Sequence, residues 1–231
     1  MIFEWYSGSD ETLEVPKKLY EYEETKDSIP YRKRVRFLED VLSRESDPNW
    51  RAAILYKIGD VHFFEGHKDE AIRLFAAAEA EFDPFGANFR DIAEEYCRTL
   101  FRLVEHRYFE AGSSPQIVDY GTRIIQSLNG PWLYEYERFA LFSLLGGAFN
   151  DLGKTHDLPW CYRVALNYYY SAHHLEPNGA GLLESIIYCH FNLDELDRCR
   201  AMYEVFLRVG DRYEHKERVA EFMRTRVGLA T

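Results

Sequence analysis

The sequence predicts an all-α protein in which antiparallel helix pairs stack into a solenoid. Apolar residues recur at spacings of three and four along most of the chain, which places them on one face of successive helices. Short breaks that contain glycine or proline separate these helices. A two-helix pattern also returns along the chain, and such units stack because one helix pair cannot bury its apolar face alone.

The repeated pattern is clearest in residues 52–85. Apolar side chains line one face of each of its two helices, and small residues allow the helices to approach closely. The segment resembles the tetratricopeptide repeat (TPR), although His62 replaces the usual tyrosine and Pro84 lies one place late. The residues that carry the resemblance are Gly59, Gly66, Ala71 and Phe75, near repeat positions 8, 15, 20 and 24.

Two further segments carry the same pattern. Residues 139–179 form a second match, in which an insertion at 154–160 lengthens the connection between the two helices. Residues 180–213 follow in phase as a third match, with Cys199 at an alanine position, because a free cysteine behaves as a small hydrophobic residue. The other packing positions are filled by Gly146, Ala165, Tyr169, Ile187, His190, Tyr203 and Phe206.

The other segments complete one predicted domain. We expect an acidic arm or a solvated surface helix in residues 1–30 and a leading helix in 31–51. Residues 86–134 read as a degenerate helical hairpin. Residues 212–231 read as the polar-faced capping helix that a solenoid needs. The TPR resemblance implies that residues 1–231 form a right-handed superhelix as a single domain.

The TPR resemblance also implies where a partner binds. First-helix positions 2, 5, 9, 12 and 13 of such repeats usually line a concave groove. Trp160 adds an anchor candidate from the insertion 154–160. The alternative is that the aromatic residues pack inside the protein and that Trp160 folds back as a lid. The predicted contact residues are Tyr56, Asp60, Phe63, Phe64, Ser143, Asn150, Asp151, Trp160, Glu184, Tyr188 and Phe191.

Charge narrows the class of partner. The predicted contact residues are aromatic, polar and acidic without a lysine or arginine, so they lack the cationic clamp of chaperone-binding TPR proteins. The chain has 28 Lys and Arg against 39 Asp and Glu, a formal net charge of −11. This balance predicts a basic protein or peptide partner, because opposite potentials steer association. It argues against nucleic acid, whose binding needs a basic surface.

These features predict a non-catalytic, protein-binding TPR protein. A compact acidic protein of this kind suits a bacterial immunity protein that neutralises a secreted toxin. A TPR adaptor, scaffold or co-chaperone that assembles a larger complex is the alternative. The sequence contains no catalytic signature such as G-x-S-x-G or a P-loop. Neither the pair His62 and His67 nor the adjacent His173 and His174 predicts a metal site, so we expect no cofactor.

The sequence also predicts a cytoplasmic location. No stretch reaches the roughly 18 apolar residues of a membrane span, and the N-terminus does not read as a signal peptide. The four cysteines form no C-x-x-C pair, which favours reduced thiols. We therefore expect no membrane association, whereas the oligomeric state stays open.

Overall fold

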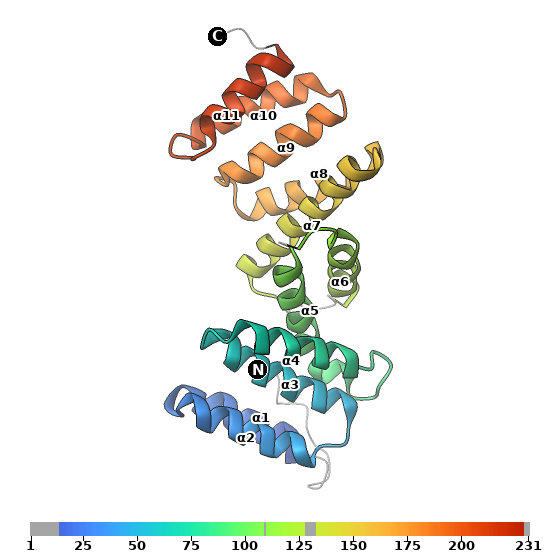
Figure 1. Ribbon diagram of the computed structural model, residues 1–231, viewed down its shortest axis with the longest axis vertical. Helices are drawn as coiled ribbons and strands as arrows, with labels where there is room; N and C mark the ends of the chain where they lie inside the picture. Colours follow the sequence, from blue (N-terminus) through green and yellow to red (C-terminus); the bar gives the residue numbers. More distant parts are fainter. Residues whose placement is uncertain (1–13, 109, 128–132, 229–231) are drawn as a thin grey trace. The chain divides into compact units, whose positions relative to one another are not determined.

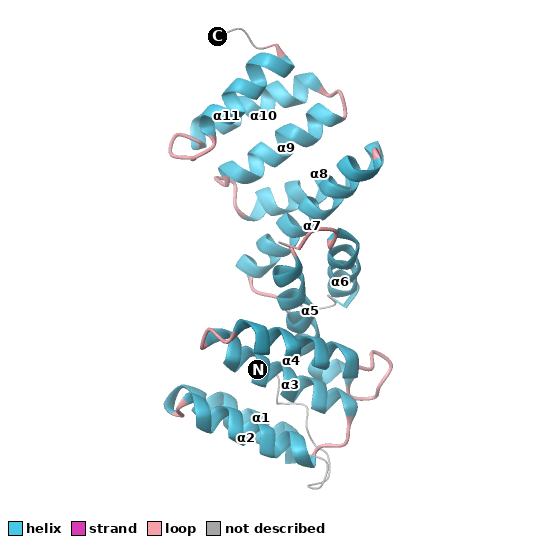
Figure 2. Cartoon of the chain, in the orientation of Figure 1, coloured by secondary structure: helices cyan, strands magenta, loops and turns pink. Residues whose placement is uncertain are grey.

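The prediction of an all-α protein is confirmed. The computed structural model describes residues 14–108, 110–127 and 133–228 of the chain. Helices joined by short turns make up its regular structure, and no strand occurs among the described residues (Figures 1 and 2). Successive helices pair as antiparallel hairpins, as they do in TPR-like proteins.

The chain divides into two compact units, Met1–Leu103 and Val104–Thr231, and one domain over residues 1–231 stays a prediction. The division falls within helix α5 (Ala93–Arg107), inside the segment 86–134 where the repeat pattern is least regular. A helix pair in a solenoid is held mainly by its neighbours, so an irregular pair is a natural place for the core to divide.

Within its described residues, the first unit contains four complete α-helices and the beginning of α5. Helix α1 lies within the predicted acidic arm, yet it is not simply solvated, because Leu19 and Tyr22 are buried. The Tyr22 ring stacks on Phe37, with 6.2 Å between ring centroids. Residues 1–13 of the arm lie outside the described residues. The elements are α1 (Glu14–Thr25), η2 (Lys26–Ser28), α2 (Tyr31–Arg44), α3 (Pro48–Phe64), α4 (Lys68–Glu81) and η3 (Phe89–Ile92).

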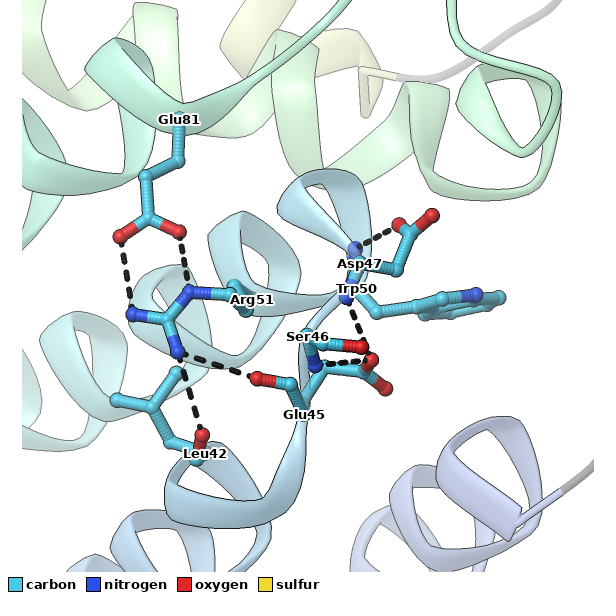
Figure 3. Close-up of polar contacts among 7 residues, drawn as sticks. All are labelled: Leu42, Glu45, Ser46, Asp47, Trp50, Arg51 and Glu81. Atoms are coloured by element: carbon cyan, nitrogen blue, oxygen red, sulfur yellow. Dashed lines mark hydrogen bonds and ion pairs between the residues drawn. The ribbon is translucent and has the colours of Figure 1, made fainter.

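The predicted leading helix 31–51 is in fact two helices, because α2 ends at Arg44 and α3 begins at Pro48. Asp47 caps α3 by accepting a hydrogen bond from the Trp50 backbone N–H at 3.0 Å, and proline is favoured at a first helical position. Arg51 fixes this junction (Figure 3). Its guanidinium donates to both Glu81 carboxylate oxygens, at 2.8 and 3.2 Å, and to the Glu45 carbonyl oxygen at 3.2 Å.

The hairpin α3–α4 packs as the TPR resemblance implies. Gly59 lies so close to Phe75 that a Cβ atom placed on Gly59 would meet the Phe75 ring at 2.7 Å. Phe75 and Ala71 are fully buried. The small residue on one helix therefore receives the large ring from the other, which is the close approach predicted from the sequence.

The described part of the second unit contains the end of α5 and six further α-helices. The predicted cap 212–231 is present as α11, with Val219 buried, followed by the π-helical turn η4. Residues 229–231 lie outside the described residues. A hydrophobic cluster of this unit is built mainly from α8 and α9, with smaller contributions from α10, α11 and η4. The elements are α6 (Ser114–Ser127), α7 (Glu135–His156), α8 (Pro159–Leu175), α9 (Ala180–Asn192), α10 (Leu196–Val209), α11 (Lys216–Phe222) and η4 (Met223–Val227).

The predicted insertion 154–160 is mostly helical rather than a loop. Helix α7 continues to His156, and α8 begins at Pro159. Asp157 ends α7 in the left-handed conformation, with φ of 51°, so the connection is a tight turn. The extra residues therefore lengthen α7 and open α8 instead of forming a separate surface segment.

Candidate functional site

The predicted contact residues of the first hairpin lie in different environments. Tyr56 is not available to a partner, because its ring packs against Phe75, with 5.8 Å between centroids, and only 2% of the residue is exposed. Burial raises the pKa of its phenol. By contrast, Phe64 is 71% exposed and Phe63 is half-buried beside it. The accessible part of this hairpin is therefore the C-terminal end of α3.

Helix α5 brings an arginine to this end of α3. The guanidinium of Arg102 lies 4.7 Å from the Phe63 ring centroid and 5.9 Å from that of Phe64, within the range of a cation–π contact. A nitrogen of Arg102 lies 3.9 Å from Asp60 Oδ1. Burial raises the pKa of Asp60, while Arg102 partly offsets this rise. We call these four residues the Phe63–Arg102 cluster.

A second cation lies on the same face of α3. The ammonium of Lys57 lies between Glu23 of α1, at 2.8 Å, and Glu95 of α5, at 3.2 Å. Burial disfavours the charged lysine, but the two carboxylates outweigh it and raise the pKa of Lys57. The predicted contact set contains no cation, yet Lys57 and Arg102 flank Asp60. Cations therefore lie on both sides of Asp60, the predicted acid of this hairpin.

In the second hairpin, the predicted residues on α7 are mostly covered. Asn150 is 8% exposed, and its side-chain oxygen accepts a hydrogen bond from the Cys189 thiol at 3.6 Å. Ser143 is half-buried. Asp151 is exposed, and its charge adds to the effect of burial in raising the pKa of Tyr108. Of the three, only Asp151 presents its side chain to solvent.

Trp160 lies at the start of α8 and is 55% exposed, so it does not fold back as a lid. Its ring makes an edge-on contact with Phe149, at 6.4 Å between centroids. Phe149 stacks on Tyr168 at 5.8 Å, and Tyr168 stacks on Phe142 at 6.3 Å. We call these four side chains the aromatic row. Its other members are not among the predicted contact residues, although Phe142 and Phe149 are seven residues apart and so share one face of a helix.

In the third hairpin, the C-terminal segment covers the predicted contact face. Glu184 is 4% exposed and accepts hydrogen bonds from the Tyr213 hydroxyl at 2.7 Å and from Arg218 at 2.5 Å. Tyr188 and Phe191 pack edge-on against Phe222 of α11, with 4.6 and 4.9 Å between centroids. These three residues of α9 therefore pack against the C-terminal cap. The sequence held a signal for this, since a predicted cap must cover the last exposed hairpin face.

The described part of the chain also bears on chemistry and membranes. It contains no group of three or more His, Cys, Asp or Glu residues that could hold a metal ion. Its helices include none with the length and apolar character needed to cross a bilayer. The side chains of Tyr170, His190 and Glu195 form a hydrogen-bonded chain, with both contacts at 2.8 Å, but His190 is 1% exposed and cannot meet a substrate.

The described residues thus define an all-α protein of TPR-like helical hairpins with exposed aromatic side chains. Two solved structures of MamA, an all-α protein of TPR-like fold, are similar to this chain. One matches with a TM-score of 0.54 at 15% identity and covers 95% of this chain and 98% of its own. The other matches with a TM-score of 0.52 at 17% identity and covers 86% of this chain and 95% of its own. At such identities the likeness concerns the fold.

Sequence comparison adds nothing to this likeness, because no protein-family model matches the chain and no curated protein matches it in sequence.

Proposed function

We propose that this is a non-catalytic protein of the TPR type that binds other proteins and acts as an adaptor or scaffold. The aromatic row carries the proposal. Four aromatic side chains contact one another in turn along the α7–α8 hairpin, and Trp160 at one end is more than half exposed. Aromatic residues dominate the energetics of protein interfaces, and a rigid helical support keeps the entropy cost of binding small.

The Phe63–Arg102 cluster is a second proposed contact surface, in the other unit. Phe64 offers the largest exposed area in this cluster, and Arg102 holds the Phe63 ring from one side. Both aromatic and arginine side chains are enriched at interaction hot spots. A candidate surface on each of the two units favours an adaptor over a protein with one inhibitory site.

The narrower prediction of a basic partner, such as a secreted toxin, rests on the formal net charge of −11. The predicted groove acids give it little local support. Asp60 lies beside Arg102, and Glu184 is buried against Arg218. We therefore base the proposed contacts on the aromatic side chains and leave the sign of the partner's charge to experiment. We likewise propose, from the sequence, a cytoplasmic location.

The test is affinity purification from the native lysate with quantitative mass spectrometry, using the wild type and three variants. Trp160→Ala removes the exposed end of the aromatic row, and Phe64→Ala removes the exposed ring of the cluster. Phe85→Ala is the matched control, because Phe85 is 96% exposed and lies in neither surface. We expect partners that are lost with Trp160→Ala or Phe64→Ala and kept with Phe85→Ala.

The loss should be measurable on a purified partner. Truncating an anchor aromatic costs about 2 kcal/mol, which is roughly a thirtyfold rise in Kd. Several partners at modest occupancy support the adaptor, whereas one stoichiometric basic partner supports the immunity protein. Equal recovery of every partner by all four proteins would exclude both surfaces. Recovery of no protein by the wild type would contradict the proposed function itself.

A further inference from the structure

Two hairpins, one in each unit, contain the same turn. Gly66 lies two residues after the end of α3 and Asp194 two residues after the end of α9, and both have the left-handed conformation. In the first turn the His67 N–H donates to the His62 carbonyl at 2.9 Å, and in the second the Glu195 N–H donates to the His190 carbonyl at 2.9 Å. Both are Schellman turns, in which the residue after the left-handed position comes back over the last turn of the helix.

The side chains of these turns are also arranged alike. In the second unit, His190 lies between the Tyr170 hydroxyl on Nε2 and the Glu195 carboxylate on Nδ1, both at 2.8 Å. In the first unit, the Tyr31 hydroxyl lies 3.0 Å from His62 Nδ1 and 2.9 Å from His67 Nδ1. A tyrosine from the preceding helix thus meets the turn histidine in both units. The first unit has an imidazole where the second has a carboxylate.

Having an imidazole in place of a carboxylate changes how many protons the cluster needs to satisfy its hydrogen bonds. A phenol has one proton, so two neutral imidazoles satisfy both contacts only when one accepts that proton and the other donates its own. If the accepting imidazole takes up a proton, the phenol loses its acceptor. A positive charge is then placed beside a second imidazole, with 5.7 Å between the His62 and His67 ring centroids. Among the described residues, no carboxylate hydrogen-bonds to the His62 ring, whereas Glu195 hydrogen-bonds to His190.

The surroundings of His62 do not remove this cost. Glu39 of α2 and Glu70 of α4 favour its protonated form, whereas Arg73 of α4 and His67 oppose it. Burial is the largest effect and lowers the pKa of His62 below its ordinary value of 6.5. The ion pair between Arg34 of α2 and Glu65, at 2.9 Å, links the same two elements alongside the cluster.

The direction of the pH effect follows from this balance. Because the pKa of His62 is lowered in the folded chain, the unfolded chain binds more protons once the pH falls below 6.5. The contribution of His62 to stability is therefore complete above that pH and is lost as the solution becomes acidic.

We propose that Tyr31, His62 and His67 form a proton-operated latch that holds the N-terminus of α2 on the α3–α4 turn and releases it under mild acid. Tyr31 is the first residue of α2, His62 lies in the last turn of α3, and His67 immediately precedes α4. The three rings pack on one another, with the Tyr31 ring centroid 5.6 Å from His62 and 5.3 Å from His67. This latch is independent of the proposed protein-binding function.

Urea unfolding of the full chain at pH 7.5 and 5.5 tests the latch. The variant His67→Glu gives His62 the carboxylate partner that His190 has in the other unit. We expect the wild type to lose stability between the two pH values and His67→Glu to lose less, because the contribution of His62 to the loss shrinks while that of His190 is unchanged. The matched control is His174→Glu, which makes the same change at an exposed histidine of α8 and should leave the loss unchanged.

A second variant guards against a failure of His67→Glu to fold. His67→Gln removes the second imidazole but keeps a hydrogen-bonding side chain, and we expect it to reduce the loss as well. Proton NMR gives a local measurement, in which the titration of the His62 ring should move to higher pH in both variants. The same pH-dependent loss in the wild type and both variants, with an unmoved His62 titration, would overturn the latch.

Discussion

Replacement of Gly146 with alanine should destabilise the α7–α8 hairpin, although alanine is the better helix former. A Cβ atom on Gly146 would meet two Tyr169 ring carbons at 2.5 Å. Ordinary carbon contacts are about 3.5–4.0 Å. The ring must therefore move by about 1 Å, and Tyr169 is only 4% exposed, so it is enclosed by other core side chains.

The two opposing effects can be estimated. Alanine in place of glycine gains about 1 kcal/mol of helix propensity. Overpacking of a well-packed core costs about 1–3 kcal/mol, and an overlap with two atoms of a buried ring belongs at the upper end. We therefore expect Gly146→Ala to lower the free energy of unfolding by about 2 kcal/mol, which corresponds to a fall in Tm of about 4–8 °C for a chain of this size.

The assay is urea unfolding followed by circular dichroism, with Gly181→Ala as the matched control. Gly181 also lies in a helix, but a Cβ atom there would meet first the end of the Tyr213 side chain, at 3.3 Å. The propensity gain should survive at this position, so Gly181→Ala should be neutral or stabilising. If Gly146→Ala is as stable as the wild type, the close approach of the two helices does not limit the size of this residue.

Three further predictions concern thiols, a buried carboxylate and pH. All four cysteines are buried, and burial raises the pKa of the Cys97 thiol to about 12, so a thiol reagent at pH 8 should label the protein only after unfolding. Arg218→Ala leaves the buried Glu184 carboxylate without its cation and should cost about 1–2 kcal/mol in urea unfolding, while Arg218→Lys recovers part of it. Burial lowers the pKa of His190 although Glu195 opposes this, so the unfolded chain binds more protons below pH 6.5. Stability should therefore fall between pH 7.5 and 5.5, and His190→Gln should make this fall shallower.

The sequence predicted the packing of the hairpins better than their boundaries. Gly59 and Gly146 receive the rings of Phe75 and Tyr169, as the repeat pattern implies. These contacts depend on residues within one hairpin, and their spacing is fixed by helix geometry. The start of α3 was placed four residues late, although Asp47 before a proline is a helix-start signal. The division into two units depends on contacts between hairpins, which no repeat position reveals.

The candidate surfaces were predicted only in part. Trp160 of the insertion and Phe64 at the end of α3 are exposed, and their role as partner contacts stays a prediction. The sequence could not show that Glu184 is buried under Arg218, because their pairing depends on where the cap packs. The order of the aromatic row was equally hidden, since Tyr168 comes from a different helix than its neighbours Phe142 and Phe149.

The charge of the predicted groove cannot be predicted from the residues of one repeat alone. Positions on a first helix face the equivalent helix of the next pair, so an acid on one helix meets whatever residue the next helix offers. Asp60 meets Arg102 of α5 in this way, and Lys57 meets Glu95. Once such pairs form inside a unit, they add little to its external field, because opposite charges at short range cancel at longer range. The formal charge of −11 then describes the whole surface rather than a groove. Partner identification should accordingly start from Trp160 and Phe64, whose exposed rings no internal partner fully covers.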